Sequence, residues 1–264
     1  MDQLRGAALG DLSRLMSDRE SSEFEPRVGH RARRVEPAPA LTDAVSSSEI
    51  DHFARLVLRG EMAAVDGFLD ALRLRGLSAE TIYLGLLEST ARRFGEMWLD
   101  DSCTFSDVTM GTIRLQQILR ALGPWFRGAI ECPLPGHRIL LVPSPGEQHT
   151  FGLFVVADFL ARAGWDVWGE SGAGDHAMRL VRDEWFDVIG VSVGCVAHLE
   201  VLTGHIQRLR SASRNRAVGI LVGGPVFARH PEYAASVGAD GTAADGSEVA
   251  HAAEKLLASS MRPG

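Results

Sequence analysis

The loop at 143–152 holds the residues of this chain whose types and spacing best suit a metal. It reads PSPGEQHTFG and follows the apolar run RILLVP at 138–143. His149 offers an imidazole nitrogen, a common metal ligand. Glu147, two residues earlier, can accept a proton from the distal ring nitrogen, which fixes the tautomer and raises the basicity of a ligating imidazole. A lone loop histidine is more often structural or merely exposed, so the prediction of a metal-ligating His149 depends on what surrounds it.

Small residues stand at the ends of two further apolar runs, and Gly152 follows His149 within the loop. Glycine lacks a Cβ, so a bulky ligand can approach its backbone closely. We therefore predict one binding site built from several segments. The candidate contacts beside Glu147 and His149 are Gln148, Thr150 and Gly152 in the loop, Ser192, Val193 and Gly194 at the end of the third run, and Gly223 and Gly224 at the end of the fourth.

Residues 137–264 predict the sheet that brings these segments together. Apolar runs of strand length occupy 138–143, 166–169, 187–193, 217–224 and 238–243, and helical patterns occupy 150–163, 174–184, 197–210, 229–236 and 245–259. Strands that alternate with helices indicate a parallel sheet covered on both faces. Five such units predict an α/β, flavodoxin-like, doubly wound parallel five-stranded sheet. Ligands of this fold bind at the carboxyl edge, where the candidate contacts meet.

Residues 49–123 predict an all-α four-helix cap domain before the α/β domain. Apolar residues recur at helical spacing over 50–58 and 62–72, and the second helix stops at Gly76. Ser78 is a suitable N-cap for a third helix that reaches Trp98. A fourth helix starts near Val108 and ends at Gly123-Pro124. Residues 124–136 are then the linker to the α/β domain at 137–264.

Residues 1–48 predict a flexible N-terminal arm, because proline, serine and mixed charge outnumber apolar anchors. A basic cluster within it is either a solvated charge run or a contact site for an acidic partner or DNA. The cluster consists of Arg27, Arg31, Arg33 and Arg34. The net charge of −7 over 264 residues argues against a nucleic-acid footprint on the whole surface.

Several other classes of protein are excluded by composition and pattern. Cys103, Cys132 and Cys195 contain no CxxC pair, which excludes a disulfide framework and a cysteine-type zinc site. No run approaches the roughly 18 apolar residues of a membrane span, and the first residues lack the apolar core of a signal peptide. A cytoplasmic protein without membrane contact is expected. No strand end carries a Ser-His-Asp or paired-carboxylate arrangement, so no self-contained enzyme is predicted.

The motifs at the predicted sheet edge resemble the cobalamin-binding domain of methionine synthase and its relatives, which carries Asp-x-His-x-x-Gly, Ser-x-Leu and Gly-Gly. The matching residues are Glu147-x-His149-x-x-Gly152, Ser192-Val193-Gly194 and Gly223-Gly224. The resemblance implies base-off, His-on cobalamin: the nucleotide tail enters a pocket between sheet and helices, and His149 becomes the lower axial ligand of cobalt. It also implies that Glu147 and Ser192 form the hydrogen-bond relay of His149, and that the glycines clear space for the tail.

The segment 76–98 is similar to the helical cap of the same superfamily, which implies that Trp98 covers the upper face of the corrin ring. Packing in the bundle core is the alternative for this tryptophan. The chain departs from the family at Glu147, which replaces aspartate, and at Val193-Gly194. The Glu-His pair that often follows the cap tryptophan is also absent, since Val108 and Thr109 lie near that spacing.

The layout of arm, cap and cobalamin domain resembles the PpaA/AerR group of photosynthesis anti-repressors. This resemblance implies a cobalamin-dependent transcriptional regulator, without enzymatic activity, that senses cofactor or light state and acts as a photoreceptor. Its partner is then a helix-turn-helix repressor of the PpsR/CrtJ type, with DNA contact through the arm as an addition. Two alternatives stay open: a corrinoid carrier protein of a methyltransferase system, and a heme-binding sensor that uses the same domain.

Overall fold

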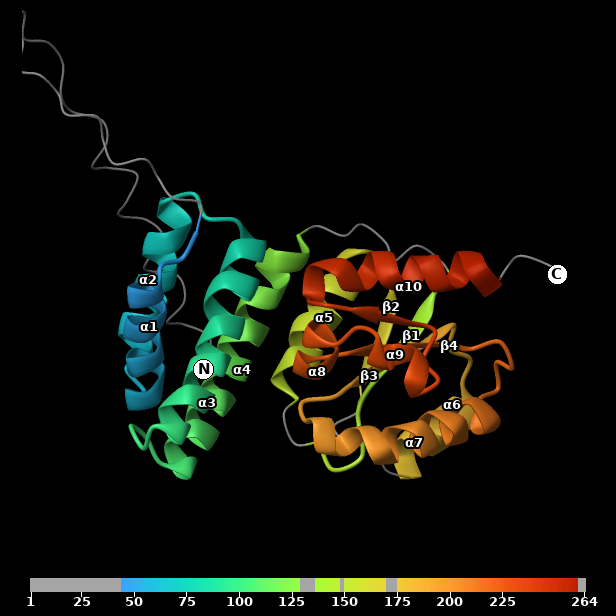
Figure 1. Ribbon diagram of the computed structural model, residues 1–264. Coiled ribbons are helices and arrows are strands. Elements are labelled where there is room, and N and C mark those ends of the chain that lie inside the picture. Colours follow the sequence, from blue (N-terminus) through green and yellow to red (C-terminus); the bar gives the residue numbers. More distant parts are fainter. Residues whose placement is uncertain (1–43, 129–135, 148–149, 170–174, 261–264) are drawn as a thin grey trace, which may run out of the picture. The chain divides into compact units, whose positions relative to one another are not determined.

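Five apolar segments of the chain pair into one parallel sheet, as the sequence predicts. In the computed structural model they are β1 Arg138–Pro143, β2 Asp166–Gly169, β3 Val188–Ser192, β4 Gly219–Gly223 and β5 Gly241–Ala243. Their order is β2-β1-β3-β4-β5 and every pairing is parallel (Figure 1). This order confirms the flavodoxin-like doubly wound fold. The structure describes residues 44–128, 136–147, 150–169 and 175–260, so the predicted ligand His149, with Gln148 and nearly all of the arm, lies outside the described residues.

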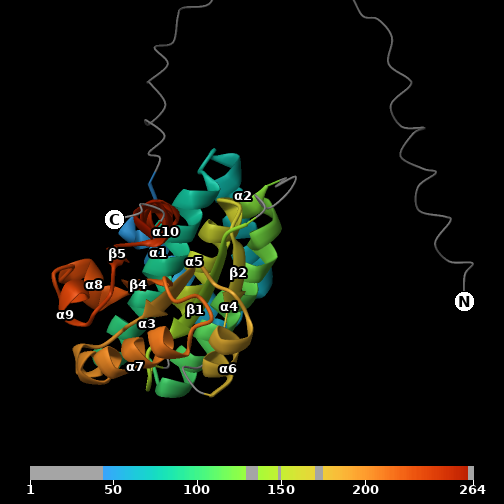
Figure 2. The same cartoon turned by 90° about the vertical axis from the view of Figure 1, so that its right-hand side faces the viewer.

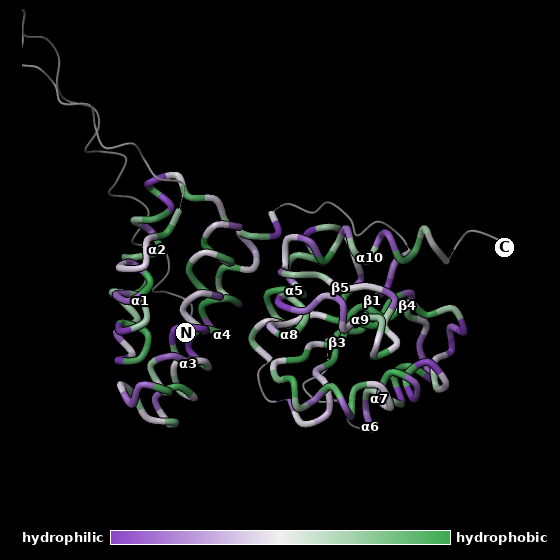
Figure 3. The backbone as a smooth tube through the Cα atoms, in the orientation of Figure 1, coloured by the Kyte–Doolittle hydropathy of each residue, from purple (hydrophilic) through white to green (hydrophobic). Residues whose placement is uncertain are grey.

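Side chains of alternate strand residues point to opposite faces of the sheet, and each face is covered by two long helices (Figure 2). Ile139 and Leu141 of β1 pack in the cluster with α5 Phe151–Arg162 and α10 Gly246–Ser260. Leu140 and Val142 pack in the cluster with α6 Asp175–Asp183 and α7 Leu199–Ala212. Figure 3 shows β1 as an apolar segment, whereas the surrounding helices alternate between apolar and polar residues.

The helical region before the sheet has the four predicted helices, the third of which changes its winding. They are α1 Ser47–Arg59, α2 Met62–Leu74, the π-helix η1 Thr81–Glu88 continuing into α3 Ser89–Leu99, and α4 Phe105–Arg127. The predicted N-cap is present, because the Thr81 N–H donates to Ser78 Oγ at 3.0 Å. Capping boxes at Ser46 and Thr104 start α1 and α4. Within the part of the chain that the structure describes, no helix has the length and apolar character needed to cross a membrane.

The fourth helix does not end at Gly123-Pro124, which corrects the sequence prediction. It continues through Pro124 to Arg127 because its last turn makes tertiary contacts with α5 and η1. Phe126 stacks on Tyr83 with ring centroids 4.0 Å apart, and Arg127 pairs with the carboxylate of Asp158. The Tyr83 hydroxyl donates to the same carboxylate at 3.0 Å. These contacts join the helical region to α5, the helix that follows the loop at 143–152.

The prediction of one helix over 229–236 is also wrong, because the structure has two short helices in this region. They are α8 Pro225–Arg229 and α9 Tyr233–Ser236. Pro231 disfavours the helical conformation for the residue before it, and His230 accordingly adopts φ −136° and ψ 67°. The interruption lies after β4 and leaves the sheet unchanged.

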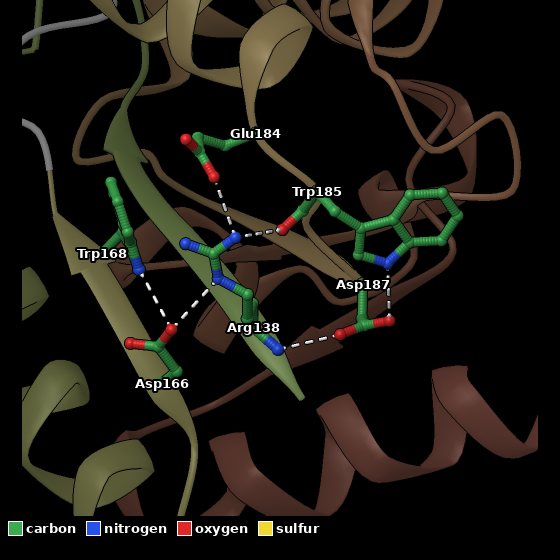
Figure 4. A network of polar contacts seen from close by, with 6 residues as sticks. All are labelled: Arg138, Asp166, Trp168, Glu184, Trp185 and Asp187. Atoms are coloured by element: carbon green, nitrogen blue, oxygen red, sulfur yellow. Dashed lines mark hydrogen bonds and ion pairs between the residues drawn. The ribbon is translucent and has the colours of Figure 1, made fainter. Parts of the chain in front are cut away.

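A network of polar contacts lies at the amino edge of the sheet, opposite the candidate site (Figure 4). The Arg138 side chain donates to Asp166 and to Glu184, in each case at 3.0 Å, and its backbone N–H donates to Asp187 at 2.8 Å. The same guanidinium lies 4.6 Å from the ring centroid of Trp168. Because Arg138 and Asp166 begin β1 and β2, and Asp187 directly precedes β3, the network serves to hold the strands in register.

Candidate functional site

Three segments meet at the carboxyl edge of the sheet, as predicted. Backbone pairing aligns the ends of β1, β3 and β4 with one another. Pro143 pairs with Ser192, and Ser192 pairs with Gly223. Just beyond the strands, the Ser144 N–H donates to the Ser192 carbonyl at 2.9 Å. The loop after β1 then turns back, because Gly146 has φ +83° and the Glu147 N–H donates to the Ser144 carbonyl at 3.0 Å. This turn places Glu147 over the end of β3.

The Glu147 carboxylate is buried at this edge, with 1% of its side chain exposed. Its Oε2 accepts the Gly194 N–H at 2.6 Å and lies 3.4 Å from Nδ1 of His198. A carboxylate removed from water needs such partners, and hydrogen bonds to ionised groups are the stronger ones. A Cβ at position 194 would lie 2.6 Å from Oε2, so any larger residue there would displace the Glu147 carboxylate. Gly194 therefore makes room for Glu147, and its predicted contact with a ligand stays a prediction.

Ser192 does not make the relay contact that the family resemblance implies. Among the described residues, no hydrogen bond joins its side chain to Glu147; the Gly194 N–H and His198 lie there instead. Ile189 and Val191 of β3 pack in the hydrophobic cluster with α6 and α7. Because side chains alternate along a strand, Ser192 lies on the opposite face of the sheet, toward α5 and α10. Gly223, its partner on β4, shares this face.

Two of the predicted glycines border open space, and one of them, Gly223, does so on that face. A Cβ on Gly152, in the first turn of α5, would have no atom within 4 Å, and a Cβ on Gly223 would meet only the Ala243 carbonyl, at 3.6 Å. Gly224 differs, since it has φ +99° and a Cβ there would lie 2.6 Å from the Val193 carbonyl oxygen. Gly224 is therefore needed for the backbone turn after β4. Room for a ligand at Gly152 and Gly223 stays a prediction.

Among the described residues of the loops after β1 and β3, two buried polar atoms have no hydrogen-bond partner. They are Oγ of Ser144, a residue with 1% exposure, and Nδ1 of His198. The 3.4 Å contact between His198 and Glu147 is within ion-pair reach but does not meet hydrogen-bond geometry. Buried polar groups are nearly always paired, so the unpaired Ser144 hydroxyl is suited to receive a polar group of a ligand, and the unpaired His198 Nδ1 is suited to a closer contact within the site.

The remaining predicted residues lie at the borders of the site. Thr150 is half-buried and precedes α5 without capping it through its side chain. Val193 is buried, and its N–H donates to the Gly223 carbonyl at 3.0 Å. Trp98 lies in the last turn of α3 with 51% exposure, so it is not a core residue of the bundle. Sequence reasoning missed His198, whose only signal is its position six residues after the end of β3.

The chain is similar to known proteins over its α/β domain and beyond. Residues 137–253 match the family described as B12 binding domain. An uncharacterized 20.5 kDa protein in the bchF-crtJ intergenic region of Rhodobacter capsulatus is 30% identical over 177 residues, which cover 67% of this chain and 92% of that protein. The monomethylamine corrinoid protein of Methanosarcina barkeri shares the fold with a TM-score of 0.64 at 14% identity, over 81% of this chain and 100% of that chain.

Proposed function

This chain belongs to the B12-binding domain family, and from that membership we propose that it is a cobalamin-dependent regulator of the PpaA/AerR type. The observation that carries the regulatory part is the relative from the bchF-crtJ intergenic region. The proposed partner is a helix-turn-helix repressor of the PpsR/CrtJ type. The chain then has no enzymatic activity of its own.

The described residues at the sheet edge fit a corrinoid. Open space at Gly223 lies on the face toward α5 and α10, and the first turn of α5 has open space at Gly152, which together would leave room for a nucleotide tail. The unpartnered Ser144 hydroxyl offers a donor and an acceptor at the same edge of the sheet. We propose that His149 holds cobalt in the base-off, His-on state and that Glu147 orients its imidazole. Cobalamin, when bound, supplies a cobalt centre whose upper ligand can be exchanged.

In this proposal, the helical region transmits the effect of cobalamin binding from the sheet edge to the protein partner. α5 begins directly after the ligand loop, and its Asp158 binds both Tyr83 of η1 and Arg127 of α4. A shift of α5 therefore changes contacts that hold the helical region. A ligand shifts such an equilibrium only through its different affinities for the two arrangements. By linkage, the repressor must then change cobalamin affinity by the same factor.

The corrinoid carrier is the second candidate, because this chain shares the fold of the monomethylamine corrinoid protein. A carrier would pass a methyl group between two partner enzymes and would have no need of a repressor. A heme sensor is the third candidate, since one imidazole can bind either metal. The three proposals differ in what they bind, which makes them separable in one set of measurements.

The test is the affinity of the full chain for a purified PpsR/CrtJ-type repressor, measured with and without hydroxocobalamin. We expect tighter binding by the loaded protein, and the same factor in the cobalamin affinity when the repressor is present. Equal affinity in both states, together with methylation of the bound cofactor by a corrinoid methyltransferase, would establish the carrier instead. Binding of heme in place of hydroxocobalamin would establish the heme sensor.

A further inference from the structure

A second histidine contacts the carboxylate that supports the proposed cobalt ligand. His198 is the last residue of the short 3-10 helix η2 Val196–His198, between β3 and α7. Its Nδ1 lies 3.4 Å from Glu147 Oε2. The other side of the ring lies against the turn before Glu147, where a Cβ on Gly146 would be 3.5 Å from Nε2. The imidazole thus packs along the loop after β1 while it belongs to the loop after β3.

Both contacts of the β3–α7 loop reach the same oxygen of Glu147. The Gly194 N–H donates to Oε2 from the backbone, and His198 approaches Oε2 from a side chain three residues beyond Cys195. A glutamate side chain has several rotatable bonds, and two contacts to one oxygen fix where its second oxygen points. Ordering the carboxylate before a ligand arrives reduces the cost of binding that ligand.

We propose that His198 is a positioning residue for cobalamin binding, acting on the orientation of Glu147 and, through it, on the imidazole of His149. The inference rests on the proposed cobalamin function. It predicts that His198 Nδ1, which has no hydrogen-bond partner in the described structure, donates to Glu147 when the site is loaded. Hydrogen bonds at functional sites are often long before ligand binding and tighten in the complex.

The test compares two substitutions at 198 with a matched control. His198→Leu removes the donor, whereas His198→Asn retains an N–H close to the position of Nδ1. His230→Leu is the control, because His230 makes the same kind of contact, with Nδ1 3.1 Å from Glu232 Oε1, at the start of α9. Each full-length variant is titrated with hydroxocobalamin. The bound cofactor is then reduced to cob(II)alamin, and the nitrogen hyperfine splitting is read from its EPR spectrum.

We expect His198→Leu to weaken cobalamin binding by about 10-fold, as loss of an outer partner of a metal ligand does, and to change the nitrogen splitting. His198→Asn and His230→Leu should keep both properties of the wild type. The inference is overturned if His198→Leu binds like the wild type with an unchanged spectrum, or if the Asn variant loses as much as the Leu variant. Failure of the wild type itself to bind hydroxocobalamin would refute the proposed function instead.

Discussion

The two adjacent glycines after β4 should respond to substitution in opposite ways. Gly224 has φ +99° and ψ 176°, a region that only glycine enters readily. Gly223 is the last residue of β4 and has no such constraint. Gly224→Ala should therefore destabilise the fold. Gly223→Val should leave the fold intact and lower cobalamin affinity, because its side chain enters the space that we assign to the nucleotide tail.

The magnitude at Gly224 has two contributions. A non-glycine residue in this backbone region costs about 1–3 kcal/mol. A Cβ 2.6 Å from the Val193 carbonyl oxygen must displace backbone, which adds about 1–3 kcal/mol of overpacking. The sum of about 2–6 kcal/mol is a large part of the 5–15 kcal/mol that usually stabilises a domain. At Gly223 a Cβ would meet only an atom at 3.6 Å, so a change within about 1 kcal/mol is expected.

Urea unfolding of both apo variants measures the free energies, and titration of the folded fraction with hydroxocobalamin measures affinity. Cobinamide, which lacks the nucleotide tail, is the ligand control for Gly223→Val, since it should bind this variant as it binds the wild type. Equal losses of stability at the two positions would refute the separation of roles. Equal losses of cobalamin and cobinamide affinity at Gly223 would show that no tail lies there.

Three further predictions concern other parts of the structure. Tyr83→Phe removes the hydroxyl that donates to Asp158 at 3.0 Å, and urea unfolding should show a loss of about 1 kcal/mol. Burial raises the pKa of Glu88, with Arg92 opposing and Asp245 adding to the shift. An acid whose pKa is raised in the folded state destabilises the fold once the pH exceeds that pKa, because the buried group then carries a charge. Glu88→Gln should therefore raise the free energy of unfolding more at about pH 8 than at about pH 4, as measured by paired urea curves. An equal increase in the free energy of unfolding at both pH values would contradict this. Glu147→Gln should weaken hydroxocobalamin binding by about 10–100-fold in a spectral titration, and unchanged affinity would exclude a supporting role.

The strands could be predicted closely because each is an apolar run bounded by turn residues. β1 and β2 have their predicted bounds, and β3 and β4 lie inside theirs. The end of α4 could not be predicted, since Gly123-Pro124 is a local signal to stop. Burial of Phe126 and the pairing of Arg127 with Asp158 override that signal through residues distant in sequence.

The candidate site was predictable in position but not in its contacts. The strand ends determine that the loops meet, and Glu147 does lie at that meeting point. Its partners depend on the path of the loop after β3, for which the sequence has no periodic signal. The relay role of Ser192 and the ligand role of Gly194 were inferred from resemblance, and the structure shows Gly194 against Glu147 and Ser192 on the other face.

Cobalamin binding through His149 is tested most directly by one spectral measurement on two proteins. Purified wild-type chain and His149→Ala are each mixed with hydroxocobalamin, passed through a gel-filtration column, and read by absorption. We expect the wild type to retain the pigment with the spectrum of cobalt ligated by imidazole, and the folded alanine variant to elute without it. Retention of the pigment by His149→Ala with an unchanged spectrum would contradict the assignment of His149 as the cobalt ligand.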